Sequence, residues 1–267
     1  MNEKYTMSSE LHKKIAVQLL EAEQKNVPIG ILTQAYPDIT LQDAYAIQWE
    51  GLKLRREAGE TVIGRKTGIT SRGVMEQLNW YMPDYAYLTA STRIEENSVC
   101  QFSELNIPLI EGELAFIMGK DLKEGPVTDP DVIDATLWVL PSIEIIDSRF
   151  PVWKGVTAFD SISDRGAGAR FMLSSTKKKI CEIDPRCIGM VLEKNGDLLD
   201  TAAGAEVLGS PVSAVAWLAN QMIEDGDYLK EGDIVLSGAF MAAYPAEAGD
   251  TYTVTLDGFP PLTVSFE

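Results

Sequence analysis

The sequence predicts an α+β fold, in which a helical N-terminal layer precedes a body made mostly of strands. Two stretches with helical spacing of apolar residues come first, and strand-like segments with a few inserted helices follow them. Helices and strands segregated in this way are typical of α+β proteins, whereas α/β proteins alternate them. No glycine-rich turn joins an early strand to a helix, which argues against a dinucleotide-binding fold. We expect residues 1–60 to form the helical layer and residues 61–267 a β-rich domain continuous with it.

The helical layer is predicted from two amphipathic segments. Residues 8–26 carry apolar side chains at helical spacing, and residues 41–57 form a second stripe of this kind. Thr40 and Asp43 have the spacing of a capping box at the start of the second helix. Residues 61–66 then have the character of a strand, which begins the β-rich domain.

The rest of the chain is predicted to be rich in strands. A helix is expected to start at Asp129-Pro130, because aspartate suits the cap and proline the first turn, and to end near Pro141 before a strand over 142–147. Asn-Gly between two apolar runs is a strong hairpin signal. The remaining predicted elements are a hairpin turned by Asn195-Gly196, a helix over 210–226, and strands at 233–237, 251–256 and 262–266.

Composition narrows the function classes. The chain has 267 residues and a formal charge of −17, and it has no basic stripe that could neutralise the phosphates of a nucleic acid. No apolar run approaches the ~20 residues needed to span a bilayer, and residues 1–5 lack a signal-peptide core. Three cysteines, an odd number without metal-ligand spacing, fit a reducing compartment. We therefore expect a cytoplasmic protein that binds neither nucleic acid nor membrane.

Two carboxylates inside one apolar run are the clearest sign of chemistry. In an extended strand Glu111 and Glu113 project to the same face, with Gly112 on the opposite face. Two acids on one face of an apolar strand repel each other and resist burial. A hard divalent cation such as Mg²⁺ would compensate them, although a solvated strand face also explains such a pair. Leu114, Phe116 and Met118 are expected to face the core.

Three further residues bear on this site. Glu144 lies in a second β-rich apolar run and would complete a set of three oxygen donors for Mg²⁺ or Mn²⁺. Lys66 lies between two glycines, and a lysine beside a metal site acts as acid or base when its pKa is lowered. His12, the one histidine, lies apart from these motifs and is expected on the surface, which argues against a Ser-His-Asp or Cys-His mechanism.

Over nearly its whole length the chain resembles the hydratase and decarboxylase family of meta-cleavage aromatic degradation, within the fumarylacetoacetate hydrolase superfamily. The order of the matching segments is the specific feature, since none would suffice alone. The segments are residues 36–48, 63–71 (Ile63-Gly-Arg-Lys-Thr-Gly-Ile-Thr-Ser71), 83–85 (Pro83-Asp-Tyr85), 111–116 (Glu111-Gly-Glu-Leu-Ala-Phe116), 141–149, 194–196, 207–211, 215–220 and 236–239 (Leu236-Ser-Gly-Ala239).

The resemblance implies a mixed β roll or barrel of the fumarylacetoacetate hydrolase C-terminal-domain type, with peripheral helices, assembled as a homo-oligomer. It also implies that the β-rich domain is catalytic. The implied site consists of Mg²⁺ or Mn²⁺ on Glu111, Glu113 and Glu144, catalytic Lys66 and Asp84, and substrate-binding Ser163, Asp164, Arg165, Ser237 and Gly238.

Two activities of this family are left open by the resemblance. Hydratases add water to 2-hydroxypenta-2,4-dienoate (2-oxopent-4-enoate) or a close homologue, and decarboxylases act on 4-oxalocrotonate (2-oxo-3-hexenedioate) beside the hydratase. Pro83-Asp84-Tyr85 favours the hydratase, whereas the segment around Ala169-Arg170 is more like the decarboxylase. A superfamily C–C hydrolase, or a catalytically weak partner subunit of a hydratase–decarboxylase complex, are further alternatives.

The chain departs from the family pattern at one position near the predicted site. Arg165 stands where the family usually has asparagine. A guanidinium matches a carboxylate bidentately, so Arg165 could bind the second carboxylate of an extended substrate. The alternative is that the change alters only the packing of the loop.

Overall fold

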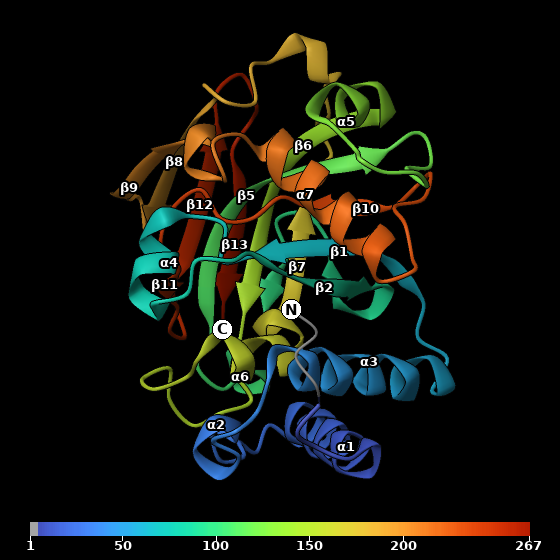
Figure 1. Ribbon diagram of the computed structural model, residues 1–267. Coiled ribbons are helices and arrows are strands. Elements are labelled where there is room, and N and C mark those ends of the chain that lie inside the picture. Colours follow the sequence, from blue (N-terminus) through green and yellow to red (C-terminus); the bar gives the residue numbers. More distant parts are fainter. Residues whose placement is uncertain (1–4) are drawn as a thin grey trace.

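The computed structural model describes residues 5–267 and confirms the predicted α+β class (Figure 1). Its larger sheet has eight strands in the order β2-β1-β10-β5-β6-β7-β3, with β11 paired to β5. Because parallel and antiparallel pairs both occur, the sheet is mixed. Its strands are β1 (Val62–Gly68), β2 (Asp84–Thr89), β3 (Arg93–Ile94), β5 (Leu109–Met118), β6 (Thr136–Ile146), β7 (Gly168–Leu173), β10 (Ile234–Leu236) and β11 (Tyr244–Pro245).

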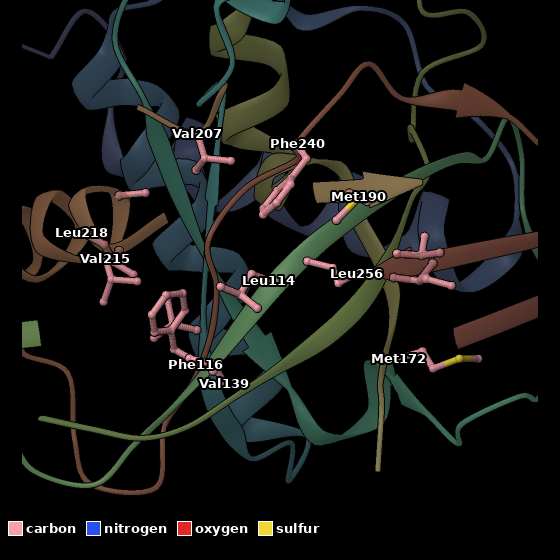
Figure 2. Packing of buried hydrophobic residues seen from close by; sticks show 14 of the residues in the cluster. Leu114, Phe116, Val139, Met172, Met190, Val207, Val215, Leu218, Phe240 and Leu256 are labelled. Atoms are coloured by element: carbon pink, nitrogen blue, oxygen red, sulfur yellow. The ribbon is translucent and has the colours of Figure 1, made fainter. Parts of the chain in front are cut away.

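A second sheet of five strands packs against the first, and the main core lies between them. Figure 2 shows Leu114 and Phe116 of β5 in this core, together with Met190 and Leu256 from the second sheet. The predicted inward face of β5 is therefore confirmed. The strands of the second sheet are β4 (Val99–Cys100), β8 (Gly189–Lys194), β9 (Asp197–Ala203), β12 (Thr251–Leu256) and β13 (Leu262–Phe266).

Seven α-helices are found in the described part of the chain. The first three and α6 gather at one end of the sheets, and α5 and α7 lie at the other (Figure 1). None of the described helices has both the length and the apolar character needed to cross a bilayer. The helices are α1 (Ser9–Lys25), α2 (Leu32–Ala35), α3 (Leu41–Glu57), α4 (Arg72–Leu78), α5 (Asp129–Ala135), α6 (Ala158–Ser163) and α7 (Pro211–Glu224).

Within the N-terminal layer, a buried polar cluster around Asp43 joins α1 to α3. Its side chain closes the predicted capping box with Thr40 and also accepts hydrogen bonds from Thr6. His12 of α1 lies 2.8 Å from Asp43 and is 5 % exposed, so the expectation of a surface histidine is wrong. A buried carboxylate needs hydrogen bonds on all sides, and the imidazole supplies one of them. The cluster holds α1 against α3. The division of the chain at residue 60 stays a prediction.

One predicted element ends earlier than expected. The helix that starts at Asp129 is capped by Thr128 and stops at Ala135, where β6 begins, so the prediction that it ends near Pro141 is wrong. The short continuous run over 136–140 (Thr-Leu-Trp-Val-Leu), with its β-branched and aromatic residues, suits a strand better than a helix. Pro141 is tolerated because it lies just beyond the last residue that pairs with β7.

The remaining predictions of secondary structure are confirmed within a few residues. Asn195 and Gly196 both have positive φ, as a two-residue hairpin turn with primed geometry requires, and they join β8 to β9. Ser210 caps α7 through its side chain. The three cysteines are free thiols, with Cys100 buried and the other two exposed.

Candidate active site and metal centre

The pairing of β5 with β6 brings together the three predicted metal ligands. Glu111 stands directly opposite Glu144 in the antiparallel register, and Glu113 lies two residues further along the same face of β5. One carboxylate oxygen from each residue lies within 4.8 Å of the other two. Converging carboxylate oxygens are the donor set that a hard divalent cation prefers.

The three carboxylates Glu111, Glu113 and Glu144, here called the carboxylate cluster, bring like charges together in a buried place. Glu113 is fully buried and Glu144 is 1 % exposed, yet Glu113 Oε1 and Glu144 Oε2 have no hydrogen-bond partner in the described part of the chain. Burial, reinforced by the neighbouring carboxylates, raises the pKa of Glu111 to about 7 and holds the pKa of Glu113 well above its usual range. A bound cation would satisfy the orphaned oxygens and remove the repulsion. The residues present therefore fit a divalent metal ion.

Lys66 supplies the nearest positive charge. It lies on β1, which pairs with β10, and β10 in turn pairs with β5. Its Nζ donates to Glu144 Oε1 at 2.7 Å and to the carbonyl oxygen of Gly166 at 3.0 Å. Burial alone would lower the pKa of Lys66, but Glu144 and Glu111 outweigh it and raise that pKa. Without a bound cation this raised pKa keeps Lys66 protonated. A lowered pKa for this lysine beside a metal ion stays a prediction.

Asp84 faces the same space from β2. It is 2 % exposed, its Oδ1 has no hydrogen-bond partner, and burial raises its pKa to about 6. It pairs with Gly68 across the β1–β2 ladder. A Cβ atom at Gly68 would lie 2.1 Å from Asp84 Oδ1, so only glycine permits this approach. This close approach explains why β1, the strand that carries Lys66, ends in glycine.

The five predicted substrate-binding residues are placed in two groups. Gly238 donates its backbone N–H to Glu113 Oε2 at 2.8 Å, and the adjacent Ser237 donates its hydroxyl to the carbonyl of Leu114. The hydrogen bond from Gly238 fixes the orientation of Glu113, whereas Ser237 is bonded to the backbone of β5. Their contact with a substrate stays a prediction.

The second group begins at the last residue of α6 and continues into the segment that follows it. The side chains of this group form hydrogen bonds within the protein. Ser163 donates to the carbonyl oxygen of Phe159, and Asp164 accepts a hydrogen bond from Arg149 Nε at 2.5 Å. Arg165 is 5 % exposed and donates to Glu23 Oε1 at 3.1 Å. Among the described residues, Glu23 is the charged group with which the Arg165 guanidinium forms an ion pair. The role of these three residues toward substrate stays a prediction.

A cavity of about 170 Å³ opens beside Lys66, Asp84 and Glu111. Glu113 and Glu144 lie outside its lining, so the cluster presents one carboxylate to the cavity. The sequence motifs did not point to the apolar walls, because these come from several loops and strand ends. The apolar and small residues of the lining are Ile69, Val74, Leu109, Ile146, Trp153, Val156, Ala167 and Ala243.

A wider cavity of about 500 Å³ lies between the N-terminal layer and the larger sheet. Carboxylates that line this cavity already have partners within the protein. Glu23 pairs with Arg55, and Asp147 accepts hydrogen bonds from the backbone N–H groups of Asn106 and Ile107. The smaller cavity is lined instead by Asp84, whose Oδ1 has no partner among the described residues, and by Glu111 of the carboxylate cluster. We therefore place the chemistry in the smaller cavity.

Comparison with known proteins agrees with this geometry. The sequence profile described as "Fumarylacetoacetate (FAA) hydrolase C-terminal" matches residues 72–267, which include every residue of the carboxylate cluster. The chain belongs to the fumarylacetoacetate hydrolase family. It is also 36 % identical over 251 residues to a 2-hydroxyhexa-2,4-dienoate hydratase of Comamonas testosteroni, covering 93 % of this chain and 95 % of that one. A 4-oxalocrotonate decarboxylase of Pseudomonas sp. strain CF600 is 36 % identical over 256 residues, covering 94 % and 95 %.

A solved structure has the same fold throughout. The 4-oxalocrotonate decarboxylase from Pseudomonas putida G7, complexed with magnesium and adipate, superposes with a TM-score of 0.95 at 32 % identity. The match covers 99 % of this chain and 100 % of that one. The mixed β roll with peripheral helices that the resemblance implied is thereby confirmed.

The raised pKa of Glu111 predicts how a divalent cation stabilises the protein. Its pKa is about 7 in the folded state against 4.5 for a free glutamate, so the metal-free protein loses stability as pH rises through 7. A cation requires the ionised carboxylate and therefore binds better over the same rise in pH. We expect the increase in Tm caused by Mn²⁺ over EDTA to be several degrees larger at pH 8 than at pH 5.5. Scanning calorimetry at both pH values checks this, and an equal increase would contradict it.

Proposed function

We propose that the protein is a metal-dependent hydratase that adds water to 2-hydroxypenta-2,4-dienoate or a close homologue, giving a 4-hydroxy-2-oxo acid. The observation that carries this proposal is the buried carboxylate cluster beside Lys66, at one end of a cavity whose other walls are largely apolar. The hydratase relative covers nearly the whole chain and supports the same activity. In this proposal the reaction belongs to the breakdown of aromatic meta-cleavage products.

The carboxylate cluster would hold the metal ion, Mg²⁺ or Mn²⁺. When bound, the ion supplies a Lewis acid that stabilises negative charge on the C2 oxygen of a 2-oxo acid. The substrate's apolar chain would then extend along Ile69 and Trp153, away from the carboxylates. These walls exclude bulk water, so that one water molecule can be directed at a single carbon.

Lys66 is proposed as the proton donor. Its Nζ borders the cavity and is held by Glu144 and the carbonyl of Gly166, which fixes the direction of the third proton. Transfer of a proton to C5 of the dienol, with loss of the enol proton, gives the enone, and water then adds across C3 and C4. Asp84, which lines the same cavity as Lys66, would accept a hydrogen bond from this water through its Oδ1, which has no partner among the described residues. The sum of these steps is the addition of one water.

A 4-oxalocrotonate decarboxylase is the second candidate, favoured by the solved structure at 32 % identity. Loss of CO₂ uses the same stabilisation of charge on C2, so the carboxylate cluster does not discriminate the two reactions. The cavity lining supports the hydratase over the decarboxylase, because Lys66 is the cationic residue among its described members. The second carboxylate of 4-oxalocrotonate would lie against apolar walls without a cation, which is costly. This favours a monocarboxylate substrate and the hydratase.

A substrate panel tests the proposal. We expect the Mg²⁺- or Mn²⁺-loaded protein to remove the ultraviolet absorbance of 2-hydroxypenta-2,4-dienoate and to form a 4-hydroxy-2-oxo acid. We expect no CO₂ from 4-oxalocrotonate under the same conditions. Release of CO₂ without hydration would establish the decarboxylase. Absence of turnover on both would favour a partner subunit, which should then stimulate an added decarboxylase or hydratase.

A further inference from the structure

The segment between α6 and β7 has an unusual backbone. Arg165, Gly166 and Ala167 have φ values of 57°, 57° and 56°, so three consecutive residues are left-handed. Residues other than glycine adopt this conformation rarely and normally one at a time. Two of these three carry a Cβ atom, and such a conformation persists only where the surroundings impose it. We call residues 165–167 the left-handed turn.

The left-handed turn is in direct contact with the proposed proton donor. Its central carbonyl, that of Gly166, accepts a hydrogen bond from Lys66 Nζ at 3.0 Å. A Cβ atom at Gly166 would lie 3.3 Å from Lys66 Cε, so the two groups are closely packed. Gly166 and Ala167 also line the proposed substrate cavity. A small displacement of the turn would therefore move the ammonium group that faces the cavity.

The side chain of Arg165 leaves the turn on the other side. It lines a small cavity of about 20 Å³ between α1 and α3, whereas the substrate cavity is lined by the two residues that follow it. Its guanidinium donates to the carbonyl of Gly168 at 2.5 Å and to Glu23 Oε1 at 3.1 Å, and it lies over the ring of Tyr87. These contacts close the left-handed turn onto the last part of α1.

Glu23 is itself held in place by the N-terminal layer. Arg55 of α3 donates to Glu23 Oε2 and, at 2.9 Å, to Glu60. Burial would raise the pKa of Glu23, but the surrounding arginines outweigh burial and lower it to about 2. The residue before the turn is also fixed, because Asp164 accepts from Arg149 through both its side chain and its carbonyl. The turn is thus held on one side by the part-buried Glu23–Arg165 ion pair and on the other by the buried Arg149–Asp164 ion pair.

We propose that the Glu23–Arg165 ion pair is a positioning device for catalysis, by which α1 holds the left-handed turn so that its Gly166 carbonyl fixes the Lys66 ammonium group. Arg165 is then a positioning residue and contacts no substrate. Asparagine adopts positive φ more readily than arginine, so the ion pair compensates for a residue poorly suited to this backbone. The catalytic part of this inference rests on the proposed function. The contact between Glu23 and the left-handed turn does not depend on that function.

Variants of the two partners test the proposal. We expect Arg165→Gln and Glu23→Gln to lower kcat by about tenfold or more, with KM and the Kd for Mn²⁺ within threefold. Arg165→Asn should recover most of kcat, because asparagine tolerates the left-handed conformation. The control is Glu21→Gln, which removes the same charge from an exposed position on α1, and its kcat should stay within twofold. Arg55 keeps Glu60 as a partner in Glu23→Gln, so this variant should fold.

Hydrogen–deuterium exchange supplies a readout that needs no substrate. The amide of Ala167 donates to the carbonyl of Asp164 inside the turn, and we expect it to exchange at least about tenfold faster in Glu23→Gln than in Glu21→Gln. Equal exchange rates of the Ala167 amide in Glu23→Gln and Glu21→Gln would overturn the proposed link between Glu23 and the left-handed turn. A raised KM with unchanged kcat, or equal losses in Arg165→Gln and Arg165→Asn, would overturn the positioning role. A wild-type protein without hydratase turnover would instead refute the proposed function and leave the exchange test valid.

Discussion

Replacing Glu113 with glutamine is expected to lower kcat/KM for the dienoate by about a thousandfold or more, because it removes a proposed ligand of the metal ion. Glu113 is fully buried, and the hydrogen bond from Gly238 to its Oε2 can persist with an amide oxygen. Because the buried carboxylate is repelled by Glu144 and Glu111, its neutralisation should also raise the Tm of the metal-free protein. The variant would therefore be more stable than wild type in EDTA and inactive with metal.

The opposite signs of these two effects distinguish a metal ligand from a structural residue. Measurement of kcat/KM at saturating Mn²⁺ and of Tm in EDTA provides both numbers. The matched control is Glu124→Gln, which removes a carboxylate at an exposed position, and we expect it to leave both unchanged. Glu113→Gln that retains more than about a tenth of wild-type activity would contradict the proposed ligand set.

Replacing Lys66 with methionine is expected to lower kcat by about a hundredfold to ten-thousandfold, which is the usual contribution of a positioned acid or base. Methionine fills a similar volume but cannot donate a proton. Removal of the ammonium group leaves Glu144 Oε1 without its partner at 2.7 Å and increases the negative charge of the cluster. The affinity for Mn²⁺ should therefore rise or stay the same while turnover is lost.

Titration of Mn²⁺ into Lys66→Met, followed by single-turnover kinetics, separates the two roles of this lysine. Lys53→Met is the control, since Lys53 is exposed and pairs only with Glu50. If Lys66 served only to balance the acidic charge, the metal-loaded variant would turn over substrate at nearly the wild-type rate. That result would exclude Lys66 as the proton donor.

Local features of the site follow from the sequence, because they depend on neighbours along one strand. Glu111 and Glu113 share a face of β5 by simple alternation, and the opposite face enters the core as expected. The Asn195-Gly196 hairpin and the capping box at Thr40 are equally local. In each case two or three adjacent residues determine the conformation.

Features that depend on long-range pairing could not be derived in this way. Glu144 meets Glu111 only because β6 pairs with β5 in one particular register, which strand spacing does not determine. His12 is buried because an acid in α3 lies opposite it in space. The apolar run around Glu144 suggested this residue as a ligand and the family resemblance implied the same role. Neither gave a sign of the left-handed turn, since Arg165 departs from the family's usual asparagine.

Crystals grown with Mn²⁺ test the central claim most directly, because anomalous scattering locates the ion without reference to activity. We expect one strong anomalous peak between the carboxylates of Glu111, Glu113 and Glu144, with oxygen distances of about 2.2 Å, as for other hard divalent cations. A density map that shows these carboxylates without a peak, or with Mn²⁺ only at a surface site, would contradict it.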